Sequence, residues 1–221
     1  MGGQTTVTGW FIVKSIGFLQ AARLHPSVRG QTPGFTLLEL MVTVAILAIG
    51  AAIAAPSYSA MLKSNRTKSV ASELLAALSL ARSEAARRGQ PVSICKSSDG
   101  SSCAGSNTQW DSGWIVFVNE DNDRPAVRDS AELILLVRQN LPAGITVRPN
   151  NNFSNYLTYA RTGLANQMGT FAICSDSDKT KAQAIVIDLT RIMLANDSNG
   201  NGIPETADSG SLVDIASCES P

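Results

Sequence analysis

Residues 34–56 read GFTLLELMVTVAILAIGAAIAAP, and this stretch decides the fold of the N-terminal part of the chain. Nearly every residue from Phe35 to Ala55 is apolar. A helix of that length rises about 31 Å, which is enough to cross the hydrocarbon core of a bilayer. The alternatives are a helix buried in a soluble core and a secretory signal peptide cleaved near the small residues of AAIAAPSYSA. The length and the basic flank favour a transmembrane helix over 35–55.

The charges around this helix predict its orientation. Residues 1–34 contain Lys14, Arg23 and Arg29 and no acidic residue. Basic residues beside a membrane span stay on the cytoplasmic side, so we expect a cytoplasmic N-terminus and a single pass through the membrane. Glu39 is the one charged residue inside the apolar run. A carboxylate inside a bilayer is costly, and it therefore needs a partner or a function.

The stretch PGFTLLELMVTVAILAIGAAIAAP resembles the class III signal and N-terminal helix of type IV pilins and type II secretion pseudopilins. The resemblance implies that prepilin peptidase removes residues 1–34 as a leader, cleaving after Gly34, and then methylates Phe35. Glu39 becomes the fifth residue of the mature chain and pairs with the N-terminal amine of a neighbouring subunit. Pro56 becomes the twenty-second residue of the mature chain and kinks or loosens the helix. Most such leaders are shorter than 34 residues, which leaves open a start codon downstream of the first Met.

A helical pattern continues beyond Pro56 to the end of residues 56–89. Apolar residues recur at helical spacing, while most basic residues lie off that stripe. Gly89, followed two residues later by Pro91, is a helix stop. The sequence therefore predicts one helix from about Phe35 to Arg88, whose second half is amphipathic. The stripe consists of Val70, Leu74, Leu78, Ala81 and Ala85.

Residues 90–221 change to a period of two, which predicts a β-rich head. Runs rich in Ser, Asn, Asp and Gly separate the candidate strands and indicate turns. The fold class expected is α+β, with a long N-terminal helix packed on an antiparallel β-sheet. The candidate strands are PVSICK, GWIVFV, ELILLVRQ, GITVRP, NYLTYA, TFAICS, AIVIDL and SLVDIA.

The head is similar to a narrower family. LLAALSLARSEAARRGQPVSICKSS, WDSGWIVFVNEDND and TFAICSDS follow the order of the GspH/FimT family of minor pilins and pseudopilins. The resemblance implies a bacterial inner-membrane protein with a periplasmic head that moves to the tip of a pilus or pseudopilus. Its implied role is to join other minor and major pilins in a tip complex priming assembly of a type IV pilus or a type II secretion pseudopilus. The alternative is a DNA-binding minor pilin of a competence pilus.

The four cysteines suggest two disulfides in an oxidising compartment. No pair forms a C-x-x-C motif. Four cysteines allow three pairings. The short separation of Cys95 from Cys103 favours that pair, which leaves Cys174 with Cys218.

Catalytic chemistry finds little support in the sequence. The single histidine is His25, within the predicted leader, so the mature chain lacks the histidine of Ser-His-Asp and Cys-His sites. The acidic residues form no recognised acid/base pair. We therefore expect a protein that is not an enzyme.

One segment has the spacing of a calcium loop. DSNGNGIPETAD occupies residues 197–208, with Gly202 where an EF-hand-type loop turns sharply. Asp stands at the twelfth position in place of Glu, and no helix pattern flanks the loop. The alternative is an Asn/Gly-rich surface loop without a cofactor. The ligands of a Ca²⁺ site would be Asp197, Asn199, Asn201, the Ile203 carbonyl, Glu205 and Asp208.

Nucleic acid is an unlikely partner on the basis of charge. Some relatives end their last strand in a GRxR-like pattern, and the matching stretch here, LTRIM, keeps Arg191 but has Met193 in place of a second arginine. Loss of the leader leaves 15 basic and 18 acidic residues, a net charge of −3. Residues 196–221 contain five acidic residues and no basic one. DNA binding needs a clustered basic surface instead.

Overall fold

The structure is a computed structural model that describes residues 34–208 and 211–219. The chain divides into two compact units, residues 1–47 and 48–221. A single helix, α1 (Leu37–Arg88), begins in the first unit and continues through the second. The Oγ1 atom of Thr36 accepts a hydrogen bond from the Glu39 N–H at 3.1 Å, which caps the N-terminus of α1. Gly89, with φ +64°, ends the helix in the left-handed conformation.

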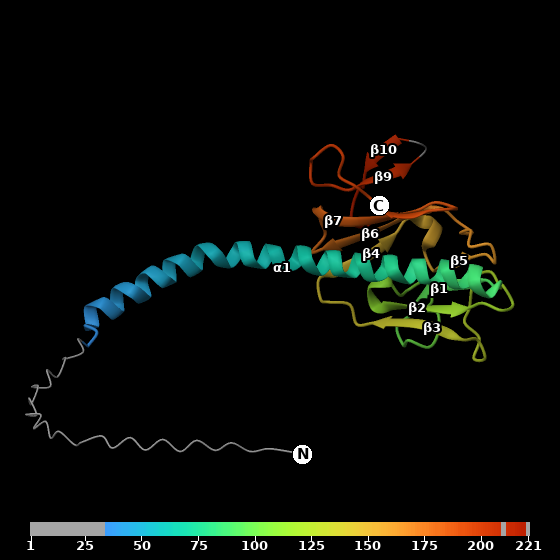
Figure 1. Ribbon diagram of the computed structural model, residues 1–221, viewed down its shortest axis with the longest axis horizontal. Coiled ribbons are helices and arrows are strands. Elements are labelled where there is room, and N and C mark those ends of the chain that lie inside the picture. The colour runs from blue at the N-terminus through green and yellow to red at the C-terminus, as the bar shows by residue number, and fades with distance from the viewer. Residues whose placement is uncertain (1–33, 209–210, 220–221) are drawn as a thin grey trace, which may run out of the picture. The chain divides into compact units, whose positions relative to one another are not determined.

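The head contains two four-stranded antiparallel sheets and a separate hairpin (Figure 1). The first sheet has the order β3-β2-β1-β5, the second has the order β4-β6-β7-β8, and the hairpin pairs β9 with β10. The first sheet comprises β1 (Val92–Lys96), β2 (Gly113–Val118), β3 (Ile134–Gln139) and β5 (Tyr156–Tyr159). The second comprises β4 (Ile145–Pro149), β6 (Gly169–Ser175), β7 (Asp178–Ile187) and β8 (Ile192–Leu194). The hairpin consists of β9 (Glu205–Asp208) and β10 (Ser211–Asp214), and two short 3-10 helices are η1 (Trp110–Ser112) and η2 (Asn151–Phe153).

The α+β class, with a long helix packed on antiparallel β-structure, is confirmed, and the strands divide between two sheets and a hairpin. The chain crosses between the sheets, because β4 joins the second sheet before β5 returns to the first. Strand β7 begins six residues before the predicted AIVIDL segment. Residues Asp176 and Ser177, both with positive φ, form a two-residue turn that pairs this polar extension with β6. Strands β8 and β9 were not predicted, since each is only three or four residues long.

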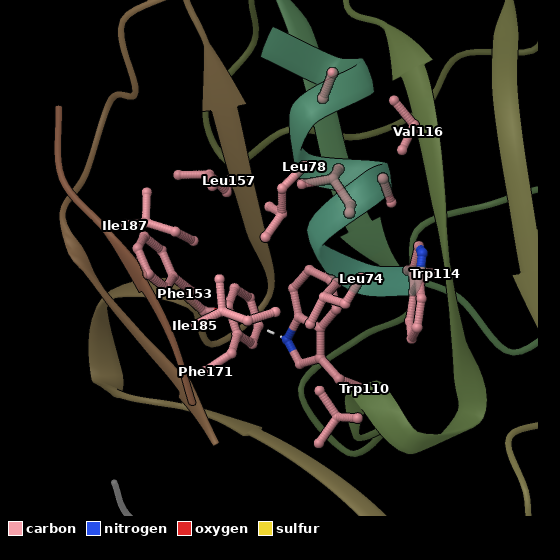
Figure 2. Close-up of a cluster of buried hydrophobic side chains, with 14 of the residues drawn as sticks. Leu74, Leu78, Trp110, Trp114, Val116, Phe153, Leu157, Phe171, Ile185 and Ile187 are labelled. Carbon is pink, nitrogen blue, oxygen red and sulfur yellow. Dashed lines mark hydrogen bonds between the residues drawn. The ribbon is translucent and has the colours of Figure 1, made fainter. Parts of the chain in front are cut away.

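The main core forms where α1 meets both sheets (Figure 2). The whole predicted stripe from Val70 to Ala85 is buried there, and Leu74 and Leu78 are fully buried. Each buried leucine side chain contributes about 2 kcal/mol. Trp110 packs edge-to-face on Phe171 at a centroid distance of 5.0 Å, and its Nε1 donates to the Phe153 carbonyl. Aromatic side chains thus fill the space between the helix and the second sheet.

Each sheet also has a small cluster on the face turned away from α1. On the first sheet, Cys95 packs with Ile115 and Phe117, and it forms a disulfide with Cys103. On the second sheet, Cys174 forms a disulfide with Cys218 beside buried alanines and Ile215. These are the pairings favoured by the cysteine spacing. Each disulfide therefore attaches a loop or the C-terminal segment to the outer face of one sheet.

Candidate assembly and processing site

The N-terminal half of α1 presents an apolar surface that no described residue covers. Every residue from Gly34 to Ser59 is exposed, and Phe35 is 84% exposed. This helix is long and apolar enough to cross a membrane, and no part of its most apolar stretch is buried. Soluble proteins rarely expose a continuous apolar surface of this size without a partner. The surface is suited to a bilayer or to the apolar helices of neighbouring subunits.

The predicted processing residues lie at the start of this helix. Gly34 lies three residues before the first helical residue, Leu37, and no neighbouring atom lies within 4 Å of the place where a Cβ would stand on Gly34. The Thr36 side chain caps the helix through the Glu39 N–H. Glu39 lies in the first turn and is exposed. Residues 1–33 of the predicted leader lie outside the described residues.

Pro56 lies inside α1 without interrupting it. A proline has no N–H to donate, so the carbonyl of Ala52 loses its usual helical partner. The side chain of Ser59 forms a hydrogen bond to the Pro56 carbonyl at 2.9 Å. The apolar and amphipathic halves are therefore one helix, with a single missing backbone bond.

Ion pairs attach the amphipathic half of α1 to the head. Lys63 lies 2.7 Å from Asp176 in the turn between β6 and β7, and Glu73 accepts a hydrogen bond from Arg138 of β3 at 2.5 Å. One pair therefore reaches each sheet.

The last turns of α1 have the charge pairs expected for ARSEAARR. Glu84 accepts hydrogen bonds from Arg87 and from Arg88, each at 2.6 Å. These bonds, from Arg87 first and then Arg88, lower the pKa of Glu84 to about 2. The pairs lie on an exposed helix face, where they contribute little to stability. This segment is structural and contains no catalytic arrangement.

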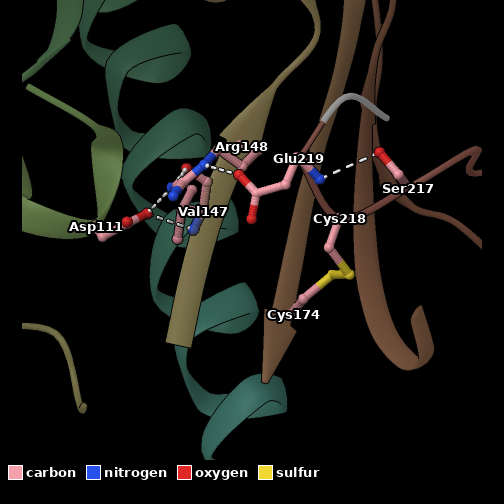
Figure 3. Close-up of polar contacts among 7 residues, drawn as sticks. All are labelled: Asp111, Val147, Arg148, Cys174, Ser217, Cys218 and Glu219. Carbon is pink, nitrogen blue, oxygen red and sulfur yellow. Dashed lines mark hydrogen bonds and ion pairs between the residues drawn. A yellow bond between two sulfur atoms is a disulfide. The ribbon is translucent and has the colours of Figure 1, made fainter. Parts of the chain in front are cut away.

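The C-terminal segment is fastened beside β4 and β6 (Figure 3). Cys218 bonds to Cys174, and the next residue, Glu219, accepts a hydrogen bond from Arg148 of β4 at 3.0 Å. Arg148 also pairs with Asp111, which accepts the Val147 N–H at 2.7 Å. One arginine thus links η1, the edge of the second sheet and the end of the described chain.

The predicted calcium loop brings three of its candidate ligands close together. The Asp197 carboxylate accepts the backbone N–H groups of Gly200 and Gly202 at 2.7 and 2.8 Å. Asn199 and Asn201 both donate to the carboxylate of Asp214, at 3.1 and 2.6 Å. Sequence reasoning missed Asp214, because it lies on β10 beyond the twelve-residue motif.

The remaining candidate ligands do not complete this cluster. Glu205 is 6% exposed and accepts the Ser198 N–H at 3.1 Å, while the Ile203 N–H donates to Asn201 at 2.8 Å. The side chain of Asp208 lies outside the described part of the structure. Among residues 34–208 and 211–219, no three His, Cys, Asp or Glu side chains are grouped to hold a metal. The loop closes through its own hydrogen bonds.

The arginine considered for nucleic acid lies in a mixed electrostatic setting. Arg191 pairs with Asp188 at 3.6 Å. Both residues line a cavity of about 690 Å³ between the β7–β8 edge and the β9–β10 hairpin, together with Asp214 and Met193. Two carboxylates beside one arginine do not make the basic surface that a polyanion needs.

Comparisons with known proteins agree with this architecture. The profile of the family described as Type II transport protein GspH matches residues 70–190, which is more than half of the chain. A second profile, the prokaryotic N-terminal methylation motif, matches residues 32–55. No curated protein is significantly similar to the chain in sequence.

Two solved structures are similar to the chain. The type IV minor pilin FimU of Pseudomonas aeruginosa is 23% identical over 70% of this chain and 96% of that chain, with a TM-score of 0.47. The minor pseudopilin EpsH from the type 2 secretion system of Vibrio cholerae is 12% identical over 60% of this chain and 98% of that chain, with a TM-score of 0.41.

Proposed function

Because the chain belongs to the GspH family of type II transport proteins, we propose that it joins a minor-subunit tip complex which primes assembly of a type IV pilus or a type II secretion pseudopilus. The family consists of minor pilins and pseudopilins, which are structural proteins and not enzymes. The tip-complex role and the filament that the chain serves are our proposals.

Processing comes first in this proposal. Prepilin peptidase cleaves between Gly34 and Phe35 and methylates the new amine of Phe35. The methylation-motif match over residues 32–55 and the accessible backbone at Gly34 support this step. The exposed apolar helix then holds the subunit in the inner membrane, with the head in the periplasm.

Assembly follows from the chemistry of the first turn. Cleavage creates a positively charged amine at Phe35, and Glu39 lies one helical turn away with its side chain exposed. The Glu39 carboxylate forms no ion pair within the described part of its own chain. In the filament it pairs with the Phe35 amine of a neighbouring subunit, in an apolar environment. An ion pair removed from water is strong only when its two groups meet in good geometry. Because Glu39 and the amine meet in this way at only one relative height of the two helices, the pair fixes their axial register.

One observation carries the proposal: an uncovered apolar helix that starts at the methylation motif continues without a break into the folded head. The test is incorporation of an epitope-tagged chain into filaments purified by shearing from cells that carry the complete assembly machinery. We expect the tag at substoichiometric levels, at one end of each filament in immunogold images. A tagged chain that remains entirely in the inner membrane would contradict the proposal.

A further inference from the structure

A turn beside the C-terminal end of α1 borders a small cavity. The turn spans residues 160–163, and the N–H of Gly163 donates to the Ala160 carbonyl at 2.8 Å. A Cβ on Gly163 would stand 3.5 Å from the Cβ of Ala86 and 3.6 Å from the Cγ of Arg82. The turn therefore packs directly on the helix, at the end of β5 in Figure 1.

The cavity has a volume of about 260 Å³. This is below the range of about 300–1,000 Å³ typical of drug-sized ligand sites, so it has room for the end of a side chain. Arg124 and Arg161 both line it, and both are exposed. Asn122, Thr158 and Asn166 also line the cavity. The Thr158 hydroxyl is hydrogen-bonded to Ser93 at 2.7 Å, and the Asn166 side-chain oxygen accepts the Thr158 N–H at 2.9 Å. Most of the exposed lining is apolar, and the two arginines supply its positive charge.

These two arginines differ from those elsewhere on the head. Arg138, Arg148 and Arg191 each bind a carboxylate. Arg124 and Arg161, in contrast, form no ion pair or hydrogen bond with any residue in 34–208 or 211–219. Their guanidinium groups keep all their donors for a ligand.

The acidic residues nearest in sequence, Asp121 and Asp123, form no ion pair with Arg124 or Arg161 in the described part of the chain. Asp121 accepts the N–H of Asp123 at 3.2 Å. The carboxylate of Asp123 accepts the N–H of Val127 at 3.0 and 3.2 Å and a hydrogen bond from Asn119 at 3.1 Å. Both carboxylates are thus used to close their own loop.

We propose that the cavity lined by Arg124 and Arg161 is a carboxylate-binding site that receives an acidic side chain of another protein subunit. Guanidinium groups bind carboxylates through paired, charge-assisted hydrogen bonds. An extended nucleic acid is disfavoured, because it needs a basic surface along several phosphates, and the cavity offers two arginines. The inference rests on the proposed function only for the nature of the partner, a subunit assembled beside this one.

The test measures binding to the purified full-length chain in detergent micelles at low ionic strength. The probe is a fluorescently labelled hexaglutamate peptide, followed by anisotropy. The double variant Arg124→Gln/Arg161→Gln is compared with Arg191→Gln, which removes a positive charge on the other sheet. We expect the double variant to bind at least about tenfold more weakly and the control within about twofold of the original chain. The thermal midpoint of the double variant should stay unchanged, because neither arginine has a partner to lose.

A labelled oligothymidylate of similar charge is measured in parallel. Saturable peptide binding that depends on Arg124 and Arg161 supports the site. The proposal is overturned by three results: no saturable peptide binding, equal losses in the Arg191→Gln control, or an oligonucleotide that binds the cavity more tightly than the peptide. Binding is measured on the isolated chain, so a failure of filament incorporation and a failure of this site are separate results.

Discussion

The Nε atom of Arg148 lies 3.0 Å from the Oε2 atom of Glu219, 71 residues later in the chain. Glu219 directly follows Cys218, whose disulfide to Cys174 attaches the same segment to β6. A covalent bond and an ion pair therefore hold the C-terminal segment against the second sheet. The β9–β10 hairpin and the 197–208 loop lie within the segment that this disulfide closes.

The disulfide between Cys174 and Cys218 should be the more stabilising of the two. It joins residues that are 44 positions apart in the sequence, whereas the bond between Cys95 and Cys103 joins residues eight positions apart. In the chain-entropy model these closures are worth about 4 and about 2.5 kcal/mol. Thermal unfolding of the two double-serine variants in detergent should show the larger loss for the Cys174/Cys218 pair. A larger loss for the Cys95/Cys103 pair would contradict this ranking.

Replacing Gly34 by alanine should leave the full-length precursor in the membrane, because the peptidase reads the residue before the cleaved bond. Mass spectrometry of the original chain should show a mature form beginning at methylated Phe35. Gly50→Ala is the matched control, since a Cβ at Gly50 also meets no neighbouring atom within 4 Å. A mature start after Ala55 or Ala60 would indicate a secretory signal peptide instead.

Replacing Glu39 by valine should impair assembly without harming the head. Removal of a carboxylate from an apolar span makes membrane insertion at least as favourable. Incorporation into filaments beside the original partners should fall, because the partner of the neighbouring amine is lost. Thr43→Val removes another polar group from the same helix and should incorporate normally. Equal incorporation of the Glu39→Val chain would count against the register argument.

Gly113 should tolerate no side chain. Its φ is +128°, and a Cβ there would stand 2.2 Å from the carbonyl oxygen of Arg138 on the paired strand β3. Backbone strain and the displaced strand should make Gly113→Ala less stable by about 3 kcal/mol or more. Chemical unfolding measures the difference. Gly105→Ala, at an exposed and open position, should change the stability by less than about 0.5 kcal/mol.

Asp197→Ala should lower the thermal midpoint, because the carboxylate accepts three backbone N–H groups of its own loop. Loss of such a cap costs about 1–2 kcal/mol. We expect the same loss in millimolar calcium and in chelator, since those hydrogen bonds need no metal. A stabilisation of the original chain by calcium that Asp197→Ala abolishes would establish the predicted Ca²⁺ site. Asn152→Ala, which is outside the 197–208 loop, serves as a control.

The long helix and its buried stripe could be predicted because both depend on local spacing. Apolar residues at helical intervals between Val70 and Ala85 must lie on one face of any helix, whatever packs against it. The helix stop at Gly89 is equally local. The boundaries of β1, β2 and β6 also followed from short apolar runs bounded by turn residues, and the structure places them within a residue or two.

The tertiary structure decided the partners of these elements. Sequence periodicity cannot show that β4 pairs with β6 and not with a strand of the first sheet, because strand pairing is a long-range contact. Strand β8 is too short for a periodic signal and forms only beside β7. Asp214 accepts hydrogen bonds from Asn199 and Asn201, which are also long-range contacts. Asp214 lies outside the motif of residues 197–208, so the motif could not predict them.

The amino-acid sequence by itself determined the apolar N-terminal helix, its methylation motif and the face that the helix presents to the head. These properties depend on residues a few positions apart, whose geometry is set by the backbone. Only the tertiary structure decided which arginines find a carboxylate and which do not. Arg138 meets Glu73 across 65 residues of sequence, while Arg124 and Arg161 reach one cavity and have no such partner among the described residues. Charge pairing over such separations is set by how the sheets and the helix pack, and the order of residues does not encode it locally.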